Sequence, residues 1–265
     1  MVDLRHVDWN IGVGGSSDGM LPKAVIEKDN EKYYLKLSSY NVAFGIYGIE
    51  SITEMVAYRI GRCLGVDCLE YGLLEGIVSL DNKDLNAYVS VSKDFKKGRL
   101  TISLERYFTN RENIDETTIE FIRRLKIQES IYKMFVFDYI IMNKDRHGKN
   151  IEVFLDTGKQ TPLFDNSFSL FNTYEDSKLS NTLEYDDNMR VNNFVGYQNL
   201  KDNLGLIDCE IEMRELKKED QDYIFKDLEE VLSRTRRDII WNNVYNRYED
   251  IRRVSNEKLL PISWK

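Results

Sequence analysis

The sequence predicts an α+β fold in two parts, a small β-rich N-terminal lobe followed by a larger, mainly helical C-terminal lobe. Short runs of alternating apolar residues dominate residues 23–91, whereas from about Thr117 the apolar residues recur at helical intervals. With 265 residues, 42% of them hydrophobic and 12% aromatic, the chain is long enough to bury a sizeable core. We place the N-lobe at residues 1–93 and the C-lobe at residues 94–265.

The first elements of the small lobe are predicted to be a hairpin and a helix. Residues Lys23–Leu37 contain two short alternating runs around Asp29-Asn30, which predicts an antiparallel hairpin with Lys36 inside its second strand. The tetrapeptide at residues 51–54 has the spacing of a capping box, and the apolar residues after it recur at helical intervals until Gly65. We therefore expect a helix that ends just before this glycine.

Shorter strands and a set of helices complete the predicted elements. We expect strands at Leu69–Leu80, Ala87–Val91, Ile151–Leu155 and Pro162–Phe164, with the small lobe closing near residues 92–95. A long helical stretch begins near Thr117, and the charged, amphipathic residues Glu219–Arg253 predict further helices. The result is a β-rich lobe followed by a helical one.

Composition and charge exclude several classes of protein. A formal charge of −8 and a pI near 5.1 disfavour direct nucleic-acid binding, which needs a broad basic surface. The three cysteines form no C-x-x-C pair and the two histidines lie far apart, so neither a zinc site nor a disulfide framework is indicated. The longest apolar stretches, such as Met134–Met142, are too short to span a membrane, and the N-terminus has no signal-peptide pattern. We expect a cytoplasmic protein, with delivery as an effector left open.

Three oxygen-bearing side chains predict a site for magnesium and phosphate. Asp145 is followed five residues later by Asn150, and Asp165 comes after an apolar run that can return beside them. Mg²⁺ prefers hard oxygen ligands and usually takes only one or two carboxylates from the protein, so Asn150 and Asp165 are the predicted metal ligands. Asp145 is then the candidate that orients the proton of an attacking hydroxyl. The Asp-to-Asn step equals that of the protein-kinase catalytic loop H-R-D-x-x-x-x-N, although His147 here follows the aspartate.

The wider pattern Phe137-Asp138-x4-Asn143-x-Asp145-Arg146-His147-x2-Asn150 resembles the catalytic loop of HipA-like kinases. Its D-R-H-x-x-N core also occurs in phosphatidylinositol kinases. Leu163-Phe164-Asp165 resembles the metal-binding segment, with Asn166-Ser167 where many protein kinases have Phe-Gly. The likeness is to compact members that consist of the kinase core alone. It implies a two-lobed protein-kinase-like fold that uses ATP and Mg²⁺ to phosphorylate protein Ser or Thr.

Upstream segments extend the resemblance in the same order. Residues 12–19, Gly-Val-Gly-Gly-Ser-Ser-Asp-Gly, resemble the family's phosphate loop, because glycines let backbone N–H groups approach phosphate oxygens closely. The likeness implies nucleotide contacts from this loop, from Lys36 on its strand, from Glu54 on the first helix and from Val91 at the hinge; the loop contacts are Gly14, Gly15, Ser16 and Ser17. It also implies autophosphorylation at Ser16 or Ser17, where about two added negative charges would repel nucleotide phosphates.

The remaining residues of the catalytic loop are assigned by weighing chemistry against structure. Asp145, His147 and Lys36 are the predicted catalytic residues, with His147 expected to brace the loop and not to transfer protons. Asp138 is expected to form hydrogen bonds within the large lobe, and Asn143 to cap a turn. Arg146 is interpreted either as a solvated charge or as a phosphate contact.

These observations favour an ATP- and Mg²⁺-dependent Ser/Thr protein kinase. The family likeness implies a protein substrate such as a translation factor or an aminoacyl-tRNA synthetase, and an antitoxin or other inhibitor protein as partner if the chain is a toxin. Two other hypotheses stay open. One is a kinase for lipid head groups or small alcohols, because the loop motif does not specify the acceptor. The other is a nucleotide-binding pseudokinase that acts as a scaffold.

Overall fold

The computed structural model describes residues 1–10, 21–180 and 183–265. Its strands are β1 Val2–Leu4, β2 Lys23–Lys28, β3 Glu31–Lys36, β4 Tyr40–Asn41, β5 Gly45–Ile46, β6 Gly72–Leu80, β7 Lys83–Lys93, β8 Thr101–Ser103, β9 Asp145–Arg146, β10 Glu152–Phe154, β11 Asn192–Asn193, β12 Ile211–Met213 and β13 Ile262–Trp264. Its helices are α1 Glu50–Leu64, α2 Leu104–Thr109, α3 Thr118–Arg124, α4 Gln128–Ile141, α5 Leu200–Leu204, α6 Asp220–Ile224 and α7 Arg234–Asn256, with short 3₁₀ turns η1 Gly148–Asn150 and η2 Asp176–Lys178.

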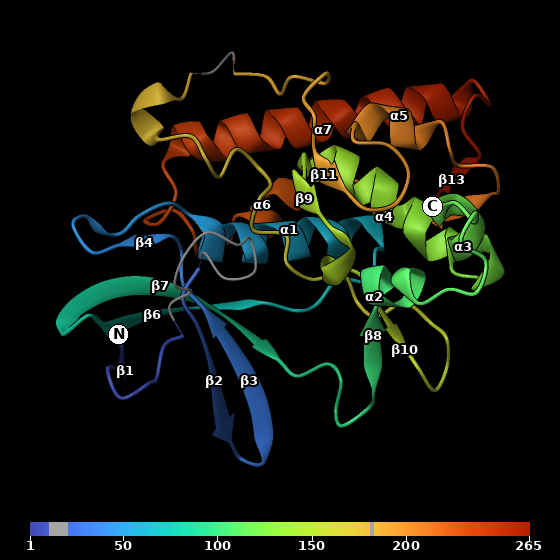
Figure 1. Ribbon diagram of the computed structural model, residues 1–265. Helices are drawn as coiled ribbons and strands as arrows, with labels where there is room; N and C mark the ends of the chain where they lie inside the picture. The colour runs from blue at the N-terminus through green and yellow to red at the C-terminus, as the bar shows by residue number, and fades with distance from the viewer. Residues whose placement is uncertain (11–20, 181–182) are drawn as a thin grey trace.

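A five-stranded sheet in the order β1-β6-β7-β3-β2 forms the small lobe (Figure 1). Two tight turns connect its antiparallel strands: Asp29 and Asn30 have φ of 54° and 60°, and Asp81 and Asn82 have φ of 47° and 60°. Residues that tolerate positive φ suit such two-residue hairpin turns, so the predicted β2–β3 hairpin is confirmed. Lys36 lies in β3 as expected, opposite Lys23 of β2.

The first helix, α1, packs against the sheet and also belongs to the core of the large lobe. Its C-terminus is confirmed, because Gly65 caps it with φ of 73°. At its N-terminus, the capping box predicted for residues 51–54 does not form. The N-cap residue Ile49 makes no side-chain hydrogen bond, and the hydroxyl of Ser38 accepts the N–H of Ser51 at 3.1 Å. The side chain of Ser51 bonds with the same hydroxyl of Ser38 at 3.0 Å, and Glu54 turns inward to Lys36. Both side chains thus connect the helix to the sheet.

Helix α4 lies at the centre of the large lobe, with α5 and α7 packed against it (Figure 1). The helical stretch predicted from Thr117 is two helices, since the chain breaks at Lys126 with φ of 58°. Thr117 caps α3 in a capping box with Glu120. Farther along, α6 and α7 account for most of the helical pattern predicted over 219–253.

The predicted strands are confirmed at three of four places. The sheet contains β6 and β7, and β10 pairs with β8, but residues 162–164 form no strand and make only an isolated bridge between Leu163 and Cys68. They are held beside the end of α1 instead. Within the part of the chain that the structure describes, no helix combines the length and apolar character that crossing a bilayer requires.

Candidate active site

Lys36 lies at the centre of a cluster of charges that joins the two lobes. Its amino group donates to Glu54 Oε1 at 2.7 Å, to Ser167 Oγ at 3.0 Å and to Asp165 Oδ1. Strand β3 supplies the lysine, α1 supplies the glutamate, and the segment after β10 supplies the aspartate and the serine. Three predicted site residues that lie far apart in the sequence therefore meet at one point.

Burial and charge act in opposite directions on this cluster. Burial favours the neutral form of Lys36, but the charges of Asp165 and Glu54 outweigh it and raise the lysine's pKa. Burial likewise opposes the charge of Asp165, and the positive charges of Lys36 and Lys23 overcome it and hold the pKa of that carboxyl below its usual range. Burial raises the pKa of Glu54 because the lysine's charge compensates it only in part.

The backbone around Asp165 is held in an uncommon conformation. Asp165 has φ of 57°, in the left-handed region that non-glycine residues seldom adopt. Glu54 Oε2 accepts the N–H of Asn166 at 2.9 Å, and the hydroxyl of Tyr71 accepts the N–H of Asp165 at 3.4 Å. Helix α1 therefore holds both the lysine and the backbone beside the aspartate.

Asn166 and Ser167, which stand where many protein kinases have Phe-Gly, form hydrogen bonds within the site. The side-chain oxygen of Asn166 accepts from Arg146 at 2.6 Å, and Ser167 Oγ donates to Asp165 Oδ1 at 3.2 Å. Both side chains are fully buried. The side chain of Asn166 thus links this segment to Arg146 of the catalytic loop.

The catalytic loop is fastened to helix α4 by a buried ion pair. Arg146 donates to both carboxylate oxygens of Asp138, at 3.0 and 2.8 Å, and to the carbonyl of Phe164 at 2.8 Å. Asn143 also donates to Asp138 at 3.0 Å and accepts the N–H of Asp145 at 3.1 Å. The structural roles of Asp138 and Asn143 are confirmed. Both interpretations of Arg146 were wrong, because its side chain is only 1% exposed and bonded within the protein.

Asp145 is held by two asparagines at the end of this loop, with His147 beside it. Asn150 donates to its backbone carbonyl at 3.1 Å, and Asn192 of β11 donates to Oδ1 of its side chain at 2.7 Å. His147 Nε2 lies 3.9 Å from Oδ2, while its Nδ1 accepts the N–H of Lys149 at 3.3 Å. This position fits a histidine that braces the loop. Asn192 was not among the predicted site residues.

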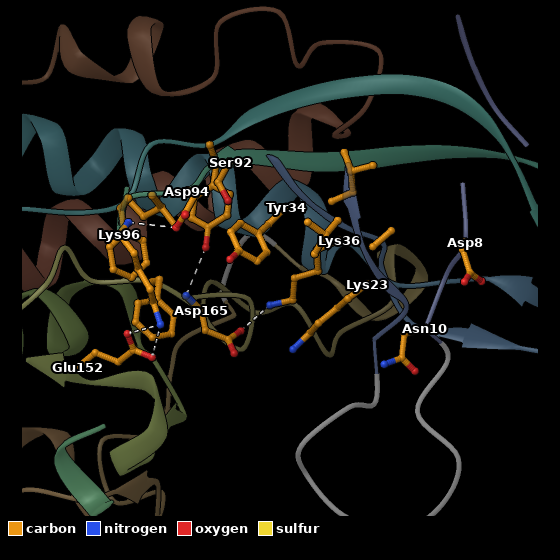
Figure 2. Close-up of a pocket in the computed structure, with 17 residues that line it drawn as sticks. Asp8, Asn10, Lys23, Tyr34, Lys36, Ser92, Asp94, Lys96, Glu152 and Asp165 are labelled. Atoms are coloured by element: carbon orange, nitrogen blue, oxygen red, sulfur yellow. Dashed lines mark hydrogen bonds and ion pairs between the residues drawn. The ribbon is translucent and has the colours of Figure 1, made fainter. Parts of the chain in front are cut away.

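A cavity of about 480 Å³ lies between the small-lobe sheet and this charge cluster. Figure 2 shows the amino groups of Lys23 and Lys36 directed toward Asp165, which lines the cavity with them. Phe164 and Phe95 line another part of it, with ring centroids 5.8 Å apart. Lys23 is thus a further cation in the cavity that the sequence analysis did not select.

The other predicted nucleotide contacts are placed differently. Ser92 lines the cavity, whereas its neighbour Val91 packs against the core of the small lobe and does not line it. The loop residues Gly14, Gly15, Ser16 and Ser17 lie outside the described residues. Asn10, the last described residue before that loop, and Lys23, close to the point where the described chain resumes at Leu21, both line the cavity.

The residues at the cavity fit a nucleotide with its metal ion. Asp165 presents a carboxylate to the cavity. Asn150 does not line it and donates its side-chain nitrogen to the carbonyl of Asp145, so its side-chain oxygen would be the second ligand. Two protein ligands suit Mg²⁺, which completes its shell with phosphate oxygens and water. Lys23 and Lys36 supply positive charge for phosphate groups, and the rings of Phe95 and Phe164 supply an apolar wall.

Comparison with known proteins shows the fold. No protein-family model matches the chain, and no curated protein sequence does. The crystal structure of the proinflammatory kinase CtkA from Helicobacter pylori is similar, with a TM-score of 0.61 and 16% sequence identity over 97% of this chain and 98% of that chain. The protein therefore has a kinase-like α+β fold over nearly its whole length, and the predicted fold class is confirmed.

Proposed function

We propose that the protein transfers the γ-phosphate of ATP, with Mg²⁺, to a hydroxyl group, and that its acceptor is a Ser or Thr side chain of a protein. The observation that carries this proposal is the contact of Lys36 with both Glu54 and Asp165 at a cavity between the lobes. A lysine–glutamate pair and a metal-binding aspartate must both be in place in an active protein kinase. The similar fold of a solved kinase supports the same reaction class.

Each residue has a defined task in this reaction. The nucleotide supplies the transferable phosphoryl group, and the ion neutralises charge on its phosphates. Lys36 and Lys23 bind phosphate oxygens, while Asp165 and Asn150 hold the ion. Asp145 orients the acceptor hydroxyl and takes its proton. His147 keeps the turn after Asp145 in shape through its bond to the N–H of Lys149.

The substitution Asp145→Asn tests the proposal most simply. The amide keeps the size of the side chain but accepts protons poorly, so we expect phosphoryl transfer to fall by at least about 10²-fold. Binding of a nonhydrolysable ATP analogue should be unchanged, because Asp145 does not line the cavity. Asp115→Asn, which makes the same change at an exposed position, is the matched control.

A phosphoryl-transfer assay with different acceptors identifies the acceptor class. Labelled ATP and Mg²⁺ are offered to the protein alone, with lysate proteins, and with vesicles that contain inositol lipids. We expect label on protein Ser or Thr, with the Asp145→Asn variant inactive. Label confined to lipid would replace the protein acceptor by a lipid one, and binding of ATP without its consumption would indicate a pseudokinase.

A further inference from the structure

The side chain of Asp145 is held by a residue from a distant part of the chain. Asn192 Nδ2 donates to Asp145 Oδ1 at 2.7 Å, although 47 positions separate the two residues. A hydrogen bond from an amide to an ionised carboxylate is short and strong compared with one between neutral groups. The position of this carboxylate is therefore set by the segment that contains β11.

Backbone hydrogen bonds fix the donor in place. Strand β11 runs parallel to β9, with Asn192 directly opposite Asp145. The N–H of Asn192 donates to the carbonyl of Lys144 at 2.9 Å, and the N–H of Phe194 donates to the carbonyl of Arg146 at 3.1 Å. Both ends of the side-chain bond thus belong to paired backbone, and the Asn192 side chain reaches Asp145 from an exposed position.

The two carboxylate oxygens of Asp145 are consequently in different situations. Oδ1 is occupied by Asn192, whereas Oδ2 has no hydrogen bond from the described residues and lies 3.9 Å from His147 Nε2. The Asp145 side chain is 24% exposed, so an acceptor can approach it from solvent. A proton acceptor needs one free oxygen in a fixed direction, and this arrangement supplies it.

We propose that Asn192 is a positioning residue that holds the Asp145 carboxylate so that Oδ2 receives the proton of the acceptor hydroxyl. This inference rests on the proposed function. In the step, the hydroxyl oxygen bonds to the γ-phosphorus of ATP while its proton passes to Oδ2. The bond from that phosphorus to the bridging oxygen breaks, and ADP leaves with the electron pair.

The isosteric substitution Asn192→Asp removes the donor and places a second carboxylate against Asp145. We expect kcat to fall by about 10²-fold, since a small displacement of a catalytic group has this effect, while KM for ATP stays unchanged. Asn188→Asp is the matched control. It makes the same charge change in the same segment, at an exposed side chain without a hydrogen bond to the described residues. An unchanged kcat in Asn192→Asp, an equal loss in the control, or a loss confined to KM would overturn the proposal.

A second measurement tests the contact without any activity. Asn192→Asp should lower Tm by about 2–4 °C in a protein of this size, because two carboxylates then face each other. The exchanged pair Asp145→Asn with Asn192→Asp restores an amide facing a carboxylate, so we expect its Tm to return to the wild-type value while kcat stays low. Failure of the exchange to restore Tm would overturn the proposal. If the variants show these Tm values but the wild-type protein transfers no phosphate, the proposed function is overturned while the pairing of Asn192 with Asp145 is still supported.

Discussion

Lys36 is the residue on which the candidate site depends most. Glu54 beside it is fully buried, and Asp165 shares the same amino group. Removing one partner of a buried ion pair usually costs about 3–5 kcal/mol, because it leaves an uncompensated charge in the interior. The same lysine thus stabilises the junction between the lobes and supplies charge to the cavity.

The stability lost in Lys36→Met should depend on pH. Without the lysine, the pKa of Glu54, already raised by burial, rises further. A group whose pKa is higher in the folded state than in the unfolded state stabilises the protein at low pH. This stabilisation is lost as the pH rises through the folded-state pKa. Loss of the lysine also raises the pKa of Asp165, because burial opposes its charge and Lys36 compensates that effect more than Lys23 does, so Asp165 changes stability in the same direction. We therefore expect a loss of about 3–5 kcal/mol at pH 8 and a smaller one at pH 5.

Urea unfolding of the wild type and the Lys36→Met variant at several pH values measures this difference. The double variant with Glu54→Gln lacks the carboxylate that contacts Lys36 from α1, so its loss relative to the wild type should vary less between pH 5 and 8 than that of the single variant. A loss in the single variant that is independent of pH would contradict this account of the cluster.

At the scale of residues, the sequence predicts most of the charge cluster because its members occur in a recognisable order. It does not predict Lys23 or Asn192. Lysines are common in strands, and no spacing rule connects Asn192 to a loop 47 positions earlier. Arg146 was misinterpreted because a cation in a loop usually lies in solvent. Its partner Asp138 lies eight positions earlier on a helix, and only the fold brings them together.

At the scale of elements, α1 ends at a position that requires glycine. Gly65 has φ of 73°, and a Cβ there would lie 2.9 Å from the Arg214 side chain. We expect Gly65→Ala to lower the free energy of unfolding by about 1–3 kcal/mol, through backbone strain and this close contact.

Gly158→Ala is the control for the backbone contribution. Gly158 has φ of 67°, and a Cβ there would meet nothing within 4 Å. Chemical denaturation of the two variants should give the larger loss for Gly65→Ala. Equal losses would mean that the contact with Arg214 contributes nothing.

Local pattern and chemistry predict the hairpin and the end of α1, where single residues decide the backbone. The helical stretch after Thr117 and residues 162–164 were predicted less well. Lys126 interrupts the helices in a left-handed conformation that an apolar pattern does not reveal. Leu163 is apolar because it packs into the large-lobe core, not because it pairs in a sheet.

At the scale of the whole molecule, two hydrophobic cores support two faces of one cavity. One core lies under the small-lobe sheet, and the other contains α4 and most of α1. Because Lys36 of the small lobe and Glu152 and Asp165 of the large lobe all line the cavity, a ligand that binds there contacts both lobes at once. Nucleotide binding should therefore stabilise the whole fold.

Thermal unfolding with increasing ATP analogue and Mg²⁺ checks this expectation. A ligand at about 100 times its Kd adds about 2.7 kcal/mol to the free energy of unfolding, so Tm should rise with concentration. The rise should be smaller without Mg²⁺ and smaller in Asp165→Asn. A Tm that does not respond to the nucleotide would contradict nucleotide binding in the cavity.

The most direct test of the account is a crystal structure with Mg²⁺ and a nonhydrolysable ATP analogue. We predict that the ion contacts Asp165 and Asn150, that Lys36 and Lys23 contact the phosphates, and that Asp145 faces the terminal phosphate. A nucleotide bound elsewhere, or an ion that touches neither Asp165 nor Asn150, would contradict it.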